Sequence, residues 1–256
     1  MMESKRLLGG KRIVFVAGED EYSSEQTLQQ LLKEAEEQGA ETEFLQAEPD
    51  PRESSNLPGL ENLKDADLAV FYLRFRTLPE EQFRHIREYV EAGKAIVAFR
   101  TSTHAFQYPE GHPLADWNDA FGIDVLGAPW IRHFGHSSST EVAVAYGAEK
   151  HPILDDVPSR FTVRSWLYHV LPYPLEGATI LLNGYAVSPE LTDCPKDAPR
   201  IHPVAWTRTN KWGGRVFMTT MGHPEDFEVL SFRTLVRNGI SWAVGLTNEK
   251  KEGSKS

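Results

Sequence analysis

Short runs of apolar residues recur along the first hundred positions of the chain and predict buried β-strands. They occupy residues 12–17, 43–45, 68–73 and 95–99, and the first of them, Arg-Ile-Val-Phe-Val-Ala, is rich in β-branched side chains. Apolar runs without a polar alternation are typical of strands that are covered on both faces of a parallel sheet. The pattern therefore indicates a sheet buried between two layers.

Two amphipathic helices are predicted between these strands. The first carries an apolar stripe over residues 28–35, and Ser23 and Gln26 have the spacing of a capping box at its start. The second opens at Pro79, a favoured first helical residue, and carries its stripe over residues 83–90. Regular alternation of strand and helix predicts a parallel, doubly wound α/β sheet.

The rest of the chain continues this pattern after an irregular middle. Residues 107–164 lack a clear period and are rich in Gly, His and Trp. Strands are predicted again at residues 179–182, 203–207 and 215–219, and a last helix at residues 231–244. The chain is thus expected to form a three-layer, doubly wound, mostly parallel sheet with an irregular middle insertion.

No internal repeat or clean boundary divides the chain, so one domain over residues 10–247 is expected. The charged segment at residues 248–256 is predicted to be a disordered tail. A length of 256 residues is ample for a hydrophobic core of this size.

Composition and charge exclude several classes of function. The formal net charge is −10, which argues against binding to nucleic acid or to an anionic membrane. No apolar run reaches the length of about 18 residues that a membrane span needs. The single cysteine, Cys194, allows neither a disulfide within the chain nor a CxxC metal site. Residues 1–10 lack the apolar core of a signal peptide, so a cytoplasmic location is expected.

Ionisable residues gather directly after four of the predicted strands, in residues 18–22, 74–76, 100–104 and 222–225. In open parallel sheets ligands bind beyond the carboxyl ends of the strands, so these segments should share one edge. The three acids after the first strand are interpreted as ligand-binding residues whose charge is balanced by the nearby arginines. The alternative interpretation is that these acids only cap the following helix and face solvent, because negative charge is favoured at a helix start. The predicted substrate-binding residues, which include one tryptophan from the middle region, are Glu19, Glu21, Tyr22, Arg74, Arg76, Arg100 and Trp130.

Histidines from several of these loops are the candidates for chemistry. His223, oriented by Glu225, is the predicted general acid or base, with His104 as a second one, because imidazole titrates near neutral pH. His104, His133 and His136 are the predicted metal ligands, with zinc as the expected ion. The alternative is that these loop histidines are ordinary polar surface groups.

Several of these segments carry a family resemblance. Arg100-Thr-Ser-Thr-His104 stands where class I glutamine amidotransferases have their nucleophile elbow, and Gly222-His223-Pro-Glu225 resembles the His-Pro-Glu of their triad. Together with further matching segments along nearly the whole chain, these residues resemble the ThuA-like family, named for trehalose utilisation. Those further segments are Gly18-Glu-Asp-Glu-Tyr-Ser, Arg74-Phe-Arg76, Tyr89-Val-Glu-Ala-Gly-Lys94, Trp130 with His133 and His136, His151-Pro-Ile, Pro203-Val-Ala-Trp-Thr207 and Gly214-Arg-Val-Phe.

The resemblance implies a flavodoxin-like sheet of the amidotransferase type, a role in carbohydrate metabolism, and zinc in some members. Two positions depart from the family pattern. Ser137 stands where relatives often have a second histidine, and Ser165-Trp166-Leu167-Tyr168 stands where many relatives have an acidic residue before Leu-Tyr. The first departure removes one candidate metal ligand.

Three functional hypotheses follow. The first is an enzyme, a hydrolase or isomerase, that uses acid/base or metal-assisted chemistry on a small sugar above an apolar platform formed by Trp117 or Trp130. The second is a serine hydrolase with Ser102 as nucleophile, although the bulky neighbours of Ser102 fit an elbow poorly. The third is a non-catalytic sugar-binding or assembly module, and exposed sheet faces would also suit a homo-oligomer. A glutaminase is set aside because the elbow lacks a thiol.

Overall fold

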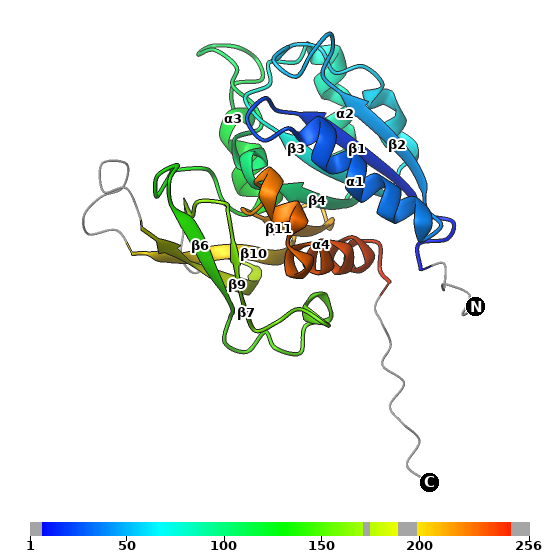
Figure 1. Ribbon diagram of the computed structural model, residues 1–256. Helices are drawn as coiled ribbons and strands as arrows, with labels where there is room; N and C mark the ends of the chain where they lie inside the picture. Colours follow the sequence, from blue (N-terminus) through cyan, green and yellow to red (C-terminus); the bar gives the residue numbers. More distant parts are fainter. Residues whose placement is uncertain (1–6, 171–174, 189–198, 247–256) are drawn as a thin grey trace.

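The computed structural model describes residues 7–170, 175–188 and 199–246. The predicted tail and Cys194 lie outside these residues. The helices α1 (Ser24–Glu37), α2 (Glu80–Glu91), α3 (Trp117–Ala120) and α4 (Leu230–Ala243) flank one central sheet (Figure 1). Within the part of the chain that is described, no helix is long and apolar enough to cross a membrane.

One half of the sheet is parallel and forms the doubly wound part of the fold. Its strands lie in the order β2-β1-β3-β4-β11, and every neighbouring pair among them is parallel. The chain order reverses between β1 and β3, which makes the carboxyl ends of these strands the expected place for a ligand. The bounds are β1 Arg12–Gly18, β2 Glu41–Gln46, β3 Leu68–Leu73, β4 Ala95–Phe99 and β11 Arg215–Thr219.

The other half of the sheet is antiparallel and continues from β11 in the order β10-β9-β6-β7. These strands span Ile201–Thr209 (β10), Ala178–Val187 (β9), Ser139–Val144 (β6) and Arg160–Val163 (β7). The predicted fold class, an α/β fold with a doubly wound parallel sheet flanked by helices, is confirmed, and its parallel strands form one half of a mixed sheet. The strands β6 and β7 lie within the middle region that the sequence left irregular, and β5 (Arg132–His133) pairs with β8 (Tyr168–His169) in a small separate ladder.

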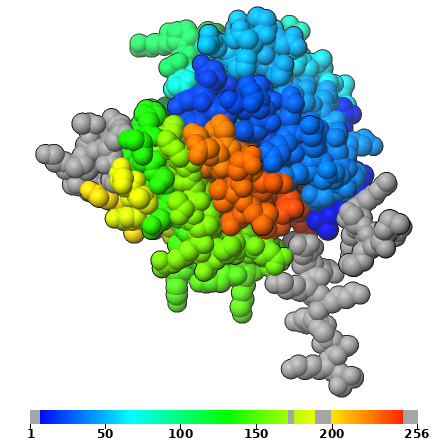
Figure 2. Space-filling view, in the orientation of Figure 1, coloured from blue at the N-terminus to red at the C-terminus, as the bar shows by residue number. Residues whose placement is uncertain are grey.

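The helices form two layers over the parallel half. α1 and α4 lie on the same face, where Arg233 of α4 forms an ion pair with Glu34 of α1 at 2.6 Å. α2 and α3 lie on the opposite face, where the rings of Phe83 and Trp117 are 5.0 Å apart. In the space-filling view, α4 and the antiparallel half form one continuous surface (Figure 2). The apolar runs of the sequence are continuous because both faces of these strands are covered.

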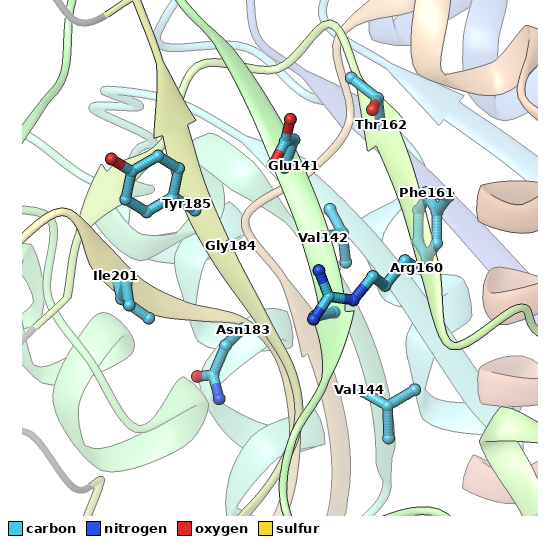
Figure 3. Close-up of a pocket in the computed structure, with 11 residues that line it drawn as sticks. Glu141, Val142, Val144, Arg160, Phe161, Thr162, Asn183, Gly184, Tyr185 and Ile201 are labelled. Carbon is cyan, nitrogen blue, oxygen red and sulfur yellow. The ribbon is translucent and has the colours of Figure 1, made fainter.

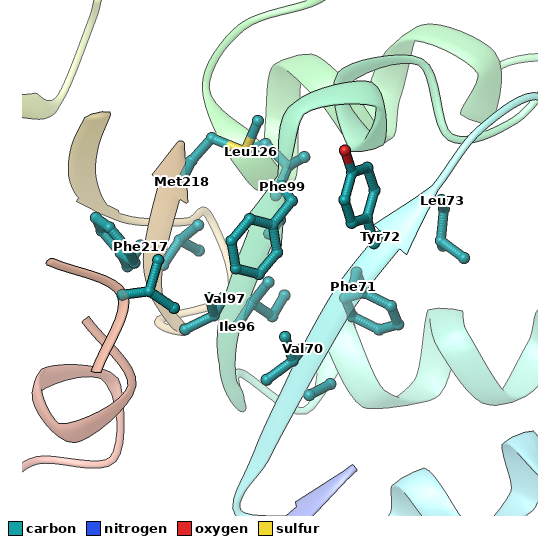
Figure 4. Close-up of a cluster of buried hydrophobic side chains, with 14 of the residues drawn as sticks. Val70, Phe71, Tyr72, Leu73, Ile96, Val97, Phe99, Leu126, Phe217 and Met218 are labelled. Atoms are coloured by element: carbon teal, nitrogen blue, oxygen red, sulfur yellow. The ribbon is translucent and has the colours of Figure 1, made fainter. Parts of the chain in front are cut away.

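The hydrophobic core runs through the parallel strands, as the predicted pattern requires. All six side chains of β3 are buried, and they pack with those of β4, β11 and Leu126 (Figure 4). Tyr72 extends this core to the carboxyl edge, where its hydroxyl donates a hydrogen bond to the Gly222 carbonyl at 2.9 Å. The core thereby fixes the loop after β11 against the end of β3.

The predicted capping box at the start of α1 is wrong. Ser23 has a left-handed backbone with φ of 53° and makes no side-chain cap. The buried carboxylate of Glu19 takes its place, because it accepts hydrogen bonds from the amides of Glu21, Tyr22 and Ser24 at 2.6, 2.7 and 2.7 Å. Of these three amides, only that of Ser24 belongs to α1, and it is one of the amides that the first turn of a helix leaves without partners. The amides of Glu21 and Tyr22 belong to the loop before α1, so Glu19 fixes this loop as well as the start of the helix.

Candidate functional site at the carboxyl edge of the sheet

Arg100 is the first residue after β4, and it projects a buried guanidinium into the carboxyl edge. Its backbone is left-handed with φ of 40°, a costly conformation for a residue other than glycine, and its exposed fraction is 0%. The guanidinium lies 4.5 Å from the ring of Tyr22, 4.6 Å from Trp166 and 4.5 Å from Tyr168. The strained elbow of the fold therefore carries a cation held by aromatic rings.

Hydrogen bonds hold this guanidinium in place. Nη1 donates to the carbonyls of Thr220 at 2.8 Å and Trp166 at 3.3 Å, and Nη2 donates to the hydroxyl of Tyr22 at 3.3 Å. These partners come from the loops after β1 and β11 and from the segment before β8. Arg100 thus ties together segments that are far apart in the sequence.

Trp166 lies at the centre of a group of histidines. Its ring centroid is 4.7 Å from that of His136, 6.0 Å from His133 and 5.9 Å from His223. The rings of His133 and His136 are 4.4 Å apart. The structure therefore gathers three of the four predicted histidines around the indole of Trp166. This tryptophan was not among the predicted site residues.

His104 lies among a different set of rings. Its imidazole is 4.9 Å from Phe75, 5.1 Å from Trp130 and 6.3 Å from Tyr168, and its Nδ1 is 3.2 Å from Thr103 Oγ1. Burial, with the nearby charges of Arg74 and Arg100, lowers the pKa of His104 to about 3. The imidazole is therefore neutral at physiological pH. Trp130 beside it keeps 38% of its surface exposed.

Acids and an arginine form the outer rim of the site. Arg74 forms ion pairs with Asp20 and Glu21, both at 3.1 Å. The hydroxyl of Tyr22 donates to Glu21 at 2.8 Å, which links this rim to Arg100. A hollow of about 320 Å³ adjoins Asp20 and is lined also by Ser23, Glu25, Asp50, Pro51 and Arg52. We call Arg74, Arg100, His104, Trp130, His133, His136, Trp166 and His223 the carboxyl-edge cluster.

Two predicted substrate-binding residues, Glu19 and Arg76, form hydrogen bonds with the backbone of the surrounding loops. The Glu19 carboxylate is occupied by the amides at the start of α1, and burial raises its pKa. Arg76 is also buried and donates to the carbonyls of Arg74, Pro51 and Glu53. Trp117, the alternative sugar platform, packs against Phe83 and Trp212 in the α2–α3 layer.

The imidazole of His223 hydrogen-bonds to the backbone of Glu225 and not to its carboxylate, the predicted orienting group. Nδ1 of His223 accepts a hydrogen bond from the Glu225 amide at 3.2 Å, whereas the Glu225 carboxylate, 69% exposed, lies 3.9 Å from it. Burial, the largest influence, lowers the pKa of His223. Because Nδ1 is an acceptor, the neutral ring carries its proton on Nε2 and is arranged as a donor rather than as a base.

Asp226 is the acid that organises this loop. It is fully buried and accepts hydrogen bonds from the Ser165 hydroxyl at 2.5 Å and from the amides of Gly222 and His223 at 2.9 and 3.2 Å. Its other oxygen accepts from the amides of Arg164 and Ser165. Ser165, noted in the sequence as a departure from the family pattern, is thus the partner of Asp226.

Ser102 is not placed as a nucleophile. Its side chain is fully buried, and its hydroxyl donates to the Phe71 carbonyl at 3.0 Å and accepts from the Leu73 amide at 3.1 Å. Both functions of the hydroxyl are used to join η2 (Arg100–His104) to β3. This geometry removes the serine hydrolase hypothesis, which required an exposed hydroxyl beside His223.

The three predicted zinc ligands lie among different aromatic rings. Among the described residues, no three His, Cys, Asp or Glu side chains are arranged to hold a metal ion. His104 packs against Phe75 and Trp130, whereas His133 and His136 pack around Trp166.

We expect the neutral state of His104 to make the folded protein less stable in acid. In the unfolded chain this imidazole gains a proton below about pH 6.5, whereas in the folded protein it stays neutral down to about pH 3. The free energy of unfolding should therefore fall as the pH falls from 7 towards 4, with about one proton of linkage due to His104.

Urea unfolding of wild type and His104→Gln at several pH values measures this linkage. The variant should lose part of the pH dependence, and His136→Gln, which replaces an exposed imidazole, should keep it. Equal pH dependence in wild type and His104→Gln would show that this imidazole is not held neutral.

Comparison with known proteins identifies the family. The family model ThuA, described as trehalose utilisation, matches residues 12–243. A crystal structure of a protein described as ThuA-like from Parabacteroides merdae aligns with a TM-score of 0.68 at 17% identity, covering 94% of this chain and 92% of that one. One from Bacteroides uniformis aligns at 0.63 and 18%, covering 93% and 92%. At these identities the alignments show a shared fold. No curated protein matches the sequence.

Proposed function

Because the chain belongs to the ThuA family, we propose that its carboxyl-edge cluster binds a small neutral carbohydrate such as trehalose. The observation that carries this proposal is the pair formed by Trp130 and His104, a partly exposed indole 5.1 Å from an imidazole held neutral. An indole offers an apolar face to a sugar ring, and a neutral imidazole exchanges hydrogen bonds with hydroxyls without demanding charge.

The polar rim supports the same ligand class. Arg74 is neutralised by Asp20 and Glu21, so the rim offers donors and acceptors without a large excess of charge. His223 would add an Nε2 donor, and His133 and His136 stand beside it on Trp166. Sites of this kind combine apolar side chains with a few polar groups that orient the ligand.

Polarisation of a bound sugar oxygen by a neutral hydrogen-bond partner is the second candidate function, and the shifted pKa of His104 favours it over acid/base catalysis by this ring. Strongly perturbed pKa values gather at functional sites. An imidazole with a pKa of about 3 carries almost no proton to donate at neutral pH. It would instead polarise a ligand oxygen as a neutral hydrogen-bond partner, the role that neutral histidines take in some isomerases.

Calorimetric titration of wild type and two tryptophan variants with trehalose and glucose tests the proposal. Trp130→Ala should weaken sugar binding at least about tenfold, since ring contacts of this kind contribute about 1.5 kcal/mol. Trp212→Ala is the matched control, because Trp212 precedes β11 and lies at the opposite edge of the parallel strands. Equal binding by wild type and Trp130→Ala would remove the proposal.

A further inference from the structure

A groove of about 740 Å³ lies on the open face of the antiparallel half (Figure 3). It is formed by β6, β7, β9 and the start of β10, and among the described residues it shares none with the carboxyl-edge cluster. Its volume falls within the range of sites for small organic ligands, which is about 300–1,000 Å³. The groove is therefore large enough to be a second binding site for a small ligand.

Cross-strand pairing explains both the hollow and its lining. Ala143 pairs with Arg160 on β7 and with Asn183 on β9, so a short side chain lies between two long ones on one face. The next row on this face places Glu141 opposite Tyr185, and Tyr185 opposite Ile201. The small central residue forms a floor, and the longer side chains form walls.

The walls carry donors, acceptors and an aromatic ring. Tyr185 is 43% exposed and Ile201 is 52% exposed, so they form an apolar step at one end. Asn183 Oδ1 is buried and has no hydrogen-bond partner among the described residues. In the same part of the chain, neither Glu141 nor Arg160 has an ion-pair partner. An acceptor, an amide and a donor thus stand ready for a ligand.

The balance of charge selects the ligand class. One acid and one base line the groove, so it is neutral on a chain whose net charge is −10. A ligand with a single strong charge would be attracted by one of the two charged side chains, Glu141 and Arg160, and repelled by the other. A polyhydroxylated ring instead offers hydroxyls to Glu141, Asn183 and Arg160 and an apolar face to Tyr185.

We propose that this groove is a second, separate binding site for a neutral oligosaccharide. Tyr185 lies under one sugar ring, and Asn183, Glu141 and Arg160 bind its hydroxyls. The proposal does not depend on the function of the carboxyl-edge cluster, because the two sites share no residue among those described.

Backbone amide NMR of the whole chain, titrated with maltotriose and with cellotriose to about 10 mM, tests this site. Amides of β6, β7 and β9 should shift with a common dissociation constant for at least one sugar. Tyr185→Ala should weaken this binding about tenfold, and the pair Glu141→Gln and Arg160→Gln should weaken it further. Tyr146→Ala, which removes a fully exposed ring in the loop after β6, is the control and should leave it unchanged.

Trp130→Ala separates this site from the proposed function, since it should weaken sugar binding at the carboxyl edge and leave the shifts of the groove amides intact. Absence of any shift in β6, β7 and β9 for both sugars overturns the proposal. A shift that depends on protein concentration, with Tyr185→Ala converting a dimer to a monomer by light scattering, also overturns it, because the groove would then be an interface between two copies.

Discussion

Replacing Asp226 by alanine should lower the free energy of unfolding by at least about 3 kcal/mol, or about 6–12 °C in Tm. The carboxylate accepts hydrogen bonds from the Ser165 hydroxyl and from the amides of Arg164, Ser165, Gly222 and His223. The amides of Arg164 and Ser165 would lose this acceptor, and those of Gly222 and His223 would keep only the Ser165 hydroxyl, at a place where Ser165, Gly222 and Asp226 are buried. Thermal unfolding followed by circular dichroism measures the loss.

Glu225→Ala is the matched control for Asp226→Ala. The two acids are adjacent in sequence, yet the Glu225 side chain is 69% exposed and makes only contacts of 3.9 Å with Arg164 and His223. Its replacement should change stability by less than about 0.5 kcal/mol. Equal losses in both variants would contradict the assignment of Asp226 as the organising acid.

Arg100→Met should cost about 2–4 kcal/mol of stability and weaken sugar binding at the carboxyl-edge cluster at least about tenfold. Methionine fills part of the space but leaves the carbonyls of Thr220 and Trp166 without their donor. It also removes the cation that lies against the rings of Tyr22, Trp166 and Tyr168. Near-ultraviolet circular dichroism and calorimetric titration measure the two effects.

Arg100→Lys tests whether the positive charge or the planar shape of the Arg100 guanidinium holds the surrounding loops in place. Lysine retains the positive charge but lacks the planar set of donors that reaches two carbonyls and the Tyr22 hydroxyl together. We expect it to recover only part of the stability and binding. If Arg100→Met bound trehalose as tightly as wild type, Arg100 would not position this site.

The parallel half of the fold was predictable because its signals are local. Continuous apolar runs gave β1, β3 and β4 within one residue, and Pro79 marked the start of α2. The strands β6 and β7 were missed because one of their faces is open to solvent, which breaks the continuous apolar pattern. The capping of α1 was missed because its acceptor, Glu19, is outside the usual capping spacing.

The site was predictable in position but not in detail. The rule that ligands bind at the carboxyl ends of parallel strands placed Arg74, Arg100, His104 and His223 at one edge, and the structure brings them there. Sequence spacing could not choose between Glu225 and Asp226, because only the packing of the Ser165 segment decides which acid is buried. Trp166 was noted only as part of a family pattern, since its role depends on contacts between distant loops.

The proposed function requires a sugar to lie beside Trp130 and His104. Titration of the isotopically labelled chain with trehalose, followed by NMR of the Trp130 indole and the His104 ring, tests this directly. We expect both resonances to shift with one dissociation constant, and the Trp212 indole to stay in place. Unmoved Trp130 and His104 signals at about 10 mM trehalose and at the same concentrations of glucose and maltose would contradict it.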